Sequence, residues 1–278
     1  MSEQDRKWPR HPRIVWQSMV KARVNFNDFY YKHRVFGKEV LFVNIPKFPS
    51  YVHSRVTRIE TKEPETLEWL DTIQAGDILY DIGANIGLYT VAGWAKARKV
   101  EHEKRKATHR DNWNKTRPTQ VFAFEPHFTN YFCLNMNIEA NGMQGVYAYC
   151  LSLGDKNSMS HINLSDPYAG AANNRMNFSA GSFDQGAIEM KLDDVVAQQK
   201  LPQPTHIKID VDGYEKQVYS GGRKTIHNAK TALIEINNDH THIVDDMLSN
   251  GFTLSGKHVR RNSPEHNYIF TKHESIDI

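Results

Sequence analysis

Cysteine is scarce in this sequence, and long apolar runs are missing from it. The 278 residues include two cysteines, Cys133 and Cys150, so no disulfide framework is encoded, and no Cys/His cluster has the spacing of a zinc site. No run of roughly eighteen apolar residues occurs, and the N-terminus has no apolar segment of the secretory type. We therefore expect a cytoplasmic protein without a membrane span.

Two common nucleotide-binding signatures are also absent. A dinucleotide-binding loop reads G-x-G-x-x-G, and a phosphate-binding loop ends in Gly-Lys-Ser/Thr. The glycine turn of this chain, Asp81-Ile-Gly-Ala-Asn-Ile-Gly, has neither pattern. The composition is ordinary, with 39% hydrophobic residues, 24% charged residues and a net charge of +3, which indicates a soluble globular protein. The length suits one large α/β domain with an appendage, or two small domains.

What the sequence does contain is a repeated pattern of a short apolar run that ends in an acid. Such runs end at Asp81, Glu125 and Asp210, and helical patterns lie between them. Strands that alternate with helices over roughly two hundred residues predict an α/β fold with a doubly wound parallel sheet. Ligands bind such sheets at the carboxyl ends of the strands, near the switch point. We therefore expect three carboxylates in one crevice.

The stretch from Ile78 to Thr90, ILYDIGANIGLYT, predicts a cofactor site. A buried strand leads into a turn between Gly83 and Gly87, where glycine permits close approach of the backbone to a ligand. The N-terminus of the following helix offers N–H groups to a carboxylate or phosphate. Without a pyrophosphate signature, the ligand should carry an amino-acid head for Asp81 and a ribose for Glu125. S-adenosylmethionine meets both requirements.

Five motifs occur in one order along the chain: GDILYDIGANIGLYT, FAFEPHFTNYFCLNMNIEANG, LSLGDKNS, KLDD and IKIDVDGYEKQVYSGG. In these motifs the sequence resembles the FkbM family of class I S-adenosylmethionine-dependent methyltransferases, from about Glu63 to Ile236 and more weakly to the end. The resemblance implies a mostly parallel, seven-stranded, Rossmann-like methyltransferase sheet. It also implies O-methylation of a hydroxyl on a sugar, a glycan or a secondary metabolite.

The resemblance also assigns cofactor-binding residues by position. They are Asp81, Gly83, Asn85 and Gly87 in the methionine-binding turn, Glu125 at the ribose, Ser152 beside the adenine, and Asp210 beside the methyl group.

Asp210 is the first candidate for the general base, or for orienting the acceptor; binding the methionine ammonium is an equal alternative. His240, with His242 near it in NNDHTH, is the next candidate because histidine titrates near neutrality, although surface histidines are common. Lys208 shares strand phase with Asp210; a Lys–Asp–Glu set would hint at ribose 2′-O-methylation, but no second lysine is evident at a fitting place. Glu235 lies within a buried strand, as a supporting acid or one bonded to backbone.

Asp210, Asp212 and Glu215 together raise the alternative of a Mg²⁺ or Mn²⁺ site. The simpler interpretation is that Asp212–Gly213 forms the turn and N-terminal cap of the next helix, with Glu215 in its first turn. We therefore expect no metal. A nucleotide-sugar-binding protein that uses the Asp-Val-Asp motif remains an alternative function.

Two basic segments bear on the domains and the acceptor. We expect a basic, aromatic-rich N-terminal extension or cap over residues 1–60, and a class I methyltransferase domain over 61–278 with a charged insertion at 98–119. Basic residues among aromatics also suit a nucleic-acid surface, so an RNA ribose methyltransferase is a second alternative. The acceptor expected first is a small molecule or glycan; the basic segments would suit an anionic one, but a solvated surface is the simpler interpretation of them. The oligomeric state is left open.

Two helix ends are also predicted. The helix that starts at Ile86 should end near Ala97, and the helix that starts at Gly213 should be closed by Gly221–Gly222.

Overall fold

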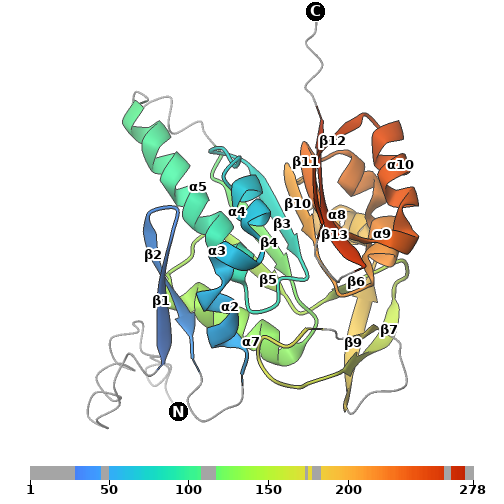
Figure 1. Ribbon diagram of the computed structural model, residues 1–278, viewed down its shortest axis with the longest axis horizontal. Helices are drawn as coiled ribbons and strands as arrows, with labels where there is room; N and C mark the ends of the chain where they lie inside the picture. The colour runs from blue at the N-terminus through green and yellow to red at the C-terminus, as the bar shows by residue number, and fades with distance from the viewer. Residues whose placement is uncertain are drawn as a thin grey trace, which may run out of the picture.

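A computed structural model of the chain has a seven-stranded sheet at its centre and helices on both faces of that sheet (Figure 1). The structure describes residues 29–44, 50–107, 117–172, 175–176, 183–259 and 264–272. Residues 1–28 of the predicted N-terminal extension and residues 108–116 of the predicted insertion lie outside the described residues.

The large sheet is mostly parallel, which confirms the predicted doubly wound α/β fold. In spatial order its strands are β12 (Phe252–Val259), β13 (Glu265–Lys272), β11 (Thr231–Asn237), β10 (His206–Ile209), β3 (Ile78–Ile82), β4 (Gln120–Phe124) and β5 (Val146–Tyr149). Every pair of neighbours is parallel except those that involve β13. The chain runs outward from β3 to β5 and then returns to β10 on the other side of β3. The switch point therefore lies between β3 and β10.

Each face of the sheet has its own hydrophobic core. One face carries α4 (Pro64–Leu70), α5 (Leu88–Ala107) and α7 (Phe128–Ala140), with the short helices α2 (Val52–Thr57) and α3 (Ile59–Lys62) beside them. The other face carries α8 (Leu192–Gln199), α9 (Glu215–His227) and α10 (His242–Ser249), with the short 3-10 helix η3 (Asn238–His240) before α10. The central strands β3 and β10 are buried along their whole length, as their apolar runs predict. No helix in the described part of the chain has the length and apolar character needed to cross a membrane.

An N-terminal hairpin packs beside α5 and α7. It consists of β1 (Tyr30–Val35) and β2 (Lys38–Val43). Phe42 is fully buried in the core that the hairpin shares with the helices. The side chains of Asn137 and Asn141 on α7 accept hydrogen bonds from the backbone N–H groups of Val43 (2.6 Å) and Leu41 (2.8 Å). These bonds satisfy the edge of β2 and fix the hairpin on the domain.

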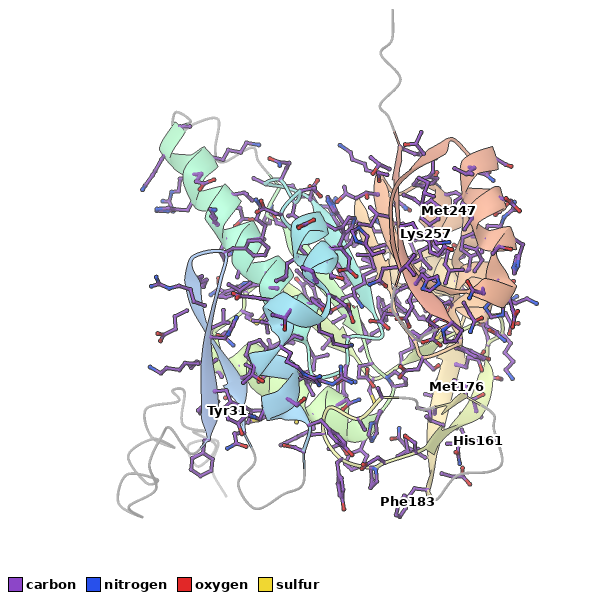
Figure 2. All side chains as sticks on the ribbon, viewed as in Figure 1. Tyr31, His161, Met176, Phe183, Met247 and Lys257 are labelled. Carbon is purple, nitrogen blue, oxygen red and sulfur yellow. The ribbon has the colours of Figure 1, made fainter. Side chains whose placement is uncertain are left out.

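A four-stranded sheet lies below the large one in the view of Figure 2, where His161, Met176 and Phe183 mark it. Its strands in spatial order are β6 (Ser152–Leu153), β9 (Phe183–Met190), β7 (Ser158–Leu164) and β8 (Arg175–Met176). β7 and β9 pair with each other as antiparallel strands. Because β6 follows β5 directly, the small sheet is connected to the large one at the carboxyl end of β5.

Both predicted helix ends are wrong, for different reasons. The first helix, α5, continues beyond Ala97 to Ala107, because Glu101 is a buried acid that pairs with Arg98 (2.9 Å) and accepts from the Thr119 N–H (2.7 Å). The second, α9, runs through Gly221 to His227. A Cβ at Gly221 would lie 1.8 Å from the Gly154 carbonyl oxygen, so this glycine permits close packing of a helix and does not end one.

Candidate cofactor and active site

A cavity opens at the carboxyl ends of β3 and β10, at the switch point. Five residues that the sequence predicts for the cofactor lie in its wall, namely Gly83, Asn85, Glu125, Ser152 and Asp210. Its open volume is about 1110 Å³, including the part that joins solvent. The cavity is open to solvent, and residues from both sides of the switch point line it.

The glycine turn presses against the end of β10. Gly83 has φ +81°, and a Cβ there would lie 1.9 Å from the carbonyl oxygen of Asp210. Gly87 has φ +83°, and a Cβ there would lie 2.4 Å from Leu134 Cδ1 of α7. Gly83 thus brings the turn to the cavity wall, whereas Gly87, which does not line the cavity, permits α5 to start against α7.

The backbone N–H groups of this turn are all engaged within the protein. The bonds run from Gly83 and Ala84 to the Phe124 carbonyl, from Asn85 to Glu125, from Ile86 to the Asn85 side chain, and from Gly87 to the Ala84 carbonyl. The Asn85 side chain also donates to the Ala171 carbonyl (2.7 Å). Asn85 therefore fixes the shape of the turn at φ +52°. An anion beside these five amides must find its donors elsewhere.

Glu125 supports the turn and keeps acceptor capacity for a ligand. Its Oε2 accepts from the Asn85 N–H (2.7 Å), and its Oε1 accepts from the His127 N–H (2.9 Å). Burial raises the pKa of Glu125 to about 7, even though these two donors act in the opposite direction. Because a carboxylate has about four lone-pair sites and the Asn130 side chain is a third hydrogen-bond partner, roughly one site remains for a hydroxyl donor in the cavity.

Ser152 lies on β6, in the part of the cavity nearest the small sheet. It is buried, and its neighbours Leu151 and Leu153 line the same wall together with Phe124 and Ile162. These four side chains are apolar, and Ser152 adds one hydroxyl. Such a surface suits a flat aromatic base that needs few hydrogen bonds.

An ion-pair cluster lies beside the glycine turn, around Lys208 of β10. Lys208 Nζ donates to Asp210 Oδ2 at 2.6 Å and lies 5.0 Å from the centre of the Tyr89 ring. Burial lowers the pKa of Lys208, but the carboxylates of Asp210, Asp81 and Glu63 outweigh it and raise that pKa overall. Lys208 is therefore a permanent, fully buried ammonium. It links Asp210, which lines the cavity, to acids that do not.

Asp81 is placed behind the cavity and not in its wall. Its Oδ2 accepts from Thr90 Oγ1 at 2.5 Å, and its Oδ1 has no hydrogen-bond partner among the described residues. Burial raises the pKa of Asp81, against the opposite effect of Lys208. The Lys208 ammonium is a counter-charge that stabilises this carboxylate.

His240 is not brought to the cavity. It ends η3, its ring lies 6.1 Å from that of His242, and burial followed by the neighbouring His242 lowers its pKa. Glu235 of β11, by contrast, is buried and lines the cavity. It lies opposite Asn267 on the antiparallel strand β13.

The acids of the Asp-Val-Asp motif are arranged around a helix start. Glu215 Oε1 accepts from the N–H groups of Val211 (3.0 Å) and Gly213 (3.1 Å), which closes the turn before α9. Asp212 has φ +53° and lines the cavity. Among the described residues no group of three His, Cys, Asp or Glu side chains is placed to hold a metal ion.

Several wall residues were not found by sequence reasoning. They are Arg55 on α2, Lys62 on α3, His127 and Asn130 at the start of α7, and Glu265 on β13. Burial lowers the pKa of His127 to about 4, so it is neutral at neutral pH. Arg55 and Lys62 come from a region whose sequence carries no recognisable motif, and only packing places them beside the cofactor turn.

The sheet and its site define the class of this protein: it has the Rossmann-like methyltransferase fold, with a ligand cavity at the switch point. The particular family follows from sequence. A family model described as the methyltransferase FkbM domain matches residues 81–270. The chain therefore belongs to the FkbM methyltransferase domain family, which confirms the resemblance seen in its motifs.

Individual relatives are more distant. The hexuronic acid methyltransferase AglP of Haloferax volcanii is 26% identical over 171 residues, which cover 60% of this chain and 59% of that protein. The crystal structure of the methyltransferase FkbM from Methylobacillus flagellatus matches with a TM-score of 0.46 and 16% identity, over 80% of this chain and 53% of the other. Trm5b from Pyrococcus abyssi matches with a TM-score of 0.46 and 11% identity, over 89% and 57%. The chain thus spans little more than half the length of these proteins.

Proposed function

We propose that this protein is an S-adenosylmethionine-dependent O-methyltransferase that acts on a hydroxyl of a sugar, a glycan or a secondary metabolite. The observation that carries the proposal is the convergence of Gly83, Glu125, Ser152 and Asp210, from four separate segments, on one cavity at the switch point. Family membership supports the methyl donor. The hexuronic acid methyltransferase among the relatives supports a sugar acceptor.

The wall residues suit the parts of this cofactor. Glu125 would accept hydrogen bonds from the ribose hydroxyls, and Ser152 with its leucine neighbours would hold the adenine. Gly83 and Asp210 would face the methionine portion, with Asp81 behind them and outside the wall. Five acids line the cavity, namely Glu125, Asp210, Asp212, Glu235 and Glu265, and this acidic lining suits a cofactor that is cationic overall. When bound, the cofactor supplies an electrophilic methyl group.

Asp210 is the proposed base. Lys208 donates to its Oδ2, and the carboxylate lines the cavity, where it would accept the proton of an acceptor hydroxyl. The ion pair also fixes the orientation of the carboxylate. A positioned base contributes on the order of 10²–10⁴-fold, and alignment of the two reactants contributes roughly 7–11 kcal/mol. Glu235 and Glu265, on adjacent strands, are placed to accept bonds from other hydroxyls of a polyol.

The N-terminal region is proposed to act as a cap, residues 1–60, on a methyltransferase domain that spans residues 61–278. Its described part packs on α7 and contributes Arg55 to the cavity wall. The cap would therefore belong to the acceptor end of the site.

Ligand binding is the first test. A thermal-shift comparison of S-adenosylhomocysteine, NAD and a UDP-sugar should show stabilisation by S-adenosylhomocysteine alone, about 2.7 kcal/mol at a concentration of 100 Kd. Stabilisation by the UDP-sugar and not by S-adenosylhomocysteine would refute the proposal.

Transfer is the second test. Labelled methyl donor should give a labelled product with glycosides and not with RNA, and the label should survive mild alkali, since ethers resist it and esters do not. Labelled RNA, or a label released by alkali, would contradict transfer to a sugar hydroxyl.

A further inference from the structure

Arg55 is a cation in the cavity wall for which the protein supplies no counter-ion in its described part. No carboxylate in the described ranges lies within ion-pair distance of its guanidinium. The other lining residues of basic type differ from it. Lys62 Nζ lies 2.8 Å from Glu63 Oε1, and the pKa of His127 is lowered to about 4 by burial.

The guanidinium of Arg55 is held in place by the neighbouring loop. Its Nε donates to the Gly170 carbonyl at 2.5 Å. That loop is itself fixed to the start of α2, because the Tyr51 N–H donates to the Ala169 carbonyl (2.7 Å) and the Tyr51 hydroxyl donates to Asp166 (2.6 Å). One donor of the guanidinium is thus used for orientation, and its planar fork suits a bidentate contact with a carboxylate.

The cavity otherwise offers little to an anion. The five turn amides from Gly83 to Gly87 are engaged internally, and acids form much of the remaining wall. Yet the proposed cofactor carries a carboxylate on its methionine portion, and an acidic sugar would bring another. An ionised carboxylate in a partly closed site requires a charged donor, since an unpaired one is costly to desolvate.

We propose that Arg55 is the carboxylate-binding residue of this cavity. The carboxylate has two possible sources, the methionine portion of the cofactor or an acid group on the acceptor. The inference rests on the proposed function, because it takes this cavity to be the site of S-adenosylmethionine. Arg55 and Lys62 lie outside the residues matched by the family model, so they are residues of this chain beyond the family's shared core.

The test compares ligands that differ in their carboxylate, with affinity measured by calorimetry. The first pair is S-adenosylhomocysteine and 5′-methylthioadenosine, which lacks the amino-acid portion. The second pair, added to protein with and without S-adenosylhomocysteine, is methyl glucuronide and methyl glucoside. The variants are Arg55→Gln and Arg55→Lys. The matched control is Arg58→Gln, which removes an exposed arginine bonded to Ser54 and outside the cavity.

A cofactor role predicts that Arg55→Gln weakens S-adenosylhomocysteine at least about tenfold and leaves 5′-methylthioadenosine within about twofold. An acceptor role predicts the same loss for the glucuronide and not for the glucoside. Arg55→Lys should lose less affinity for that carboxylate ligand than Arg55→Gln does, because it keeps the positive charge. If Arg55→Gln does not fold, the affinities of Arg55→Lys decide the test. Arg58→Gln should change nothing.

Two outcomes separate the possible failures. If the variants bind all four ligands as the wild type does, Arg55 is not a carboxylate-binding residue, whatever the protein's activity. If the wild type binds no S-adenosylhomocysteine, the proposed function fails. The comparison of methyl glucuronide with methyl glucoside then decides by itself whether Arg55 binds a carboxylate. Binding of neither carboxylate ligand by the wild type would overturn the inference as well.

Discussion

The affinity for S-adenosylhomocysteine should rise with pH through neutrality, and Glu125 should be the reason. Burial raises the pKa of this carboxyl to about 7, and its two backbone donors are already counted in that value. The ribose hydroxyls need an acceptor, and only the ionised form offers acceptors on both oxygens. A group with pKa about 7 is about one-tenth ionised at pH 6 and about nine-tenths ionised at pH 8. The dissociation constant should therefore fall by up to about tenfold over this range.

The assay is titration calorimetry at several pH values between 6 and 8, on the wild type and Glu125→Gln. The ligand's own amine contributes equally in both proteins, so the difference between the two pH profiles isolates Glu125. Glu215 is a necessary control because burial also raises its pKa to about 7. Glu215→Gln should keep the pH dependence, and thermal melts should accompany each variant. A wild-type profile that is flat, or one that Glu125→Gln reproduces, would refute the reasoning.

Three further predictions concern Asp210 and two glycines. Asp210→Asn should lower kcat at least about 100-fold while the affinity for S-adenosylhomocysteine stays within a few-fold; normal turnover would place the base elsewhere. Gly83→Ala should lower the free energy of unfolding, in urea titrations, by clearly more than the roughly 1–2 kcal/mol expected for Gly142→Ala, which has φ +57° but open space around it. Gly221→Ala should destabilise by about 1–3 kcal/mol because its Cβ would overlap a carbonyl oxygen; a stabilised variant would mean that the helix does not pack as described.

Much of the fold follows from local pattern. Buried strands such as β3 and β10 appear as short apolar runs, and the alternation of strands with helices predicts a parallel sheet. The acids at Glu125 and Asp210 follow their strands directly. Because parallel strands end at one edge, their meeting in one cavity could be predicted without coordinates.

Long-range packing accounts for what the sequence did not reveal. Gly221–Gly222 resembles the end of a helix, and only the position of the Gly154 carbonyl shows that α9 continues. The length of α5 depends on Glu101, which accepts a hydrogen bond from the Thr119 N–H, 18 residues further along the chain. His240 seemed near the site in sequence, yet it does not line the cavity.

By itself, the sequence determined the sheet, the glycine turn and the family, because each depends on residues that are neighbours in the chain. Tertiary structure decided which of those residues line the cavity and which side chains and backbone groups they contact. It set Asp81 behind the wall, joined Lys208 to Asp210, and engaged every amide of the turn from Gly83 to Gly87. It also placed Arg55 in the wall from a helix with no motif, since contacts between distant segments depend on packing and not on local pattern.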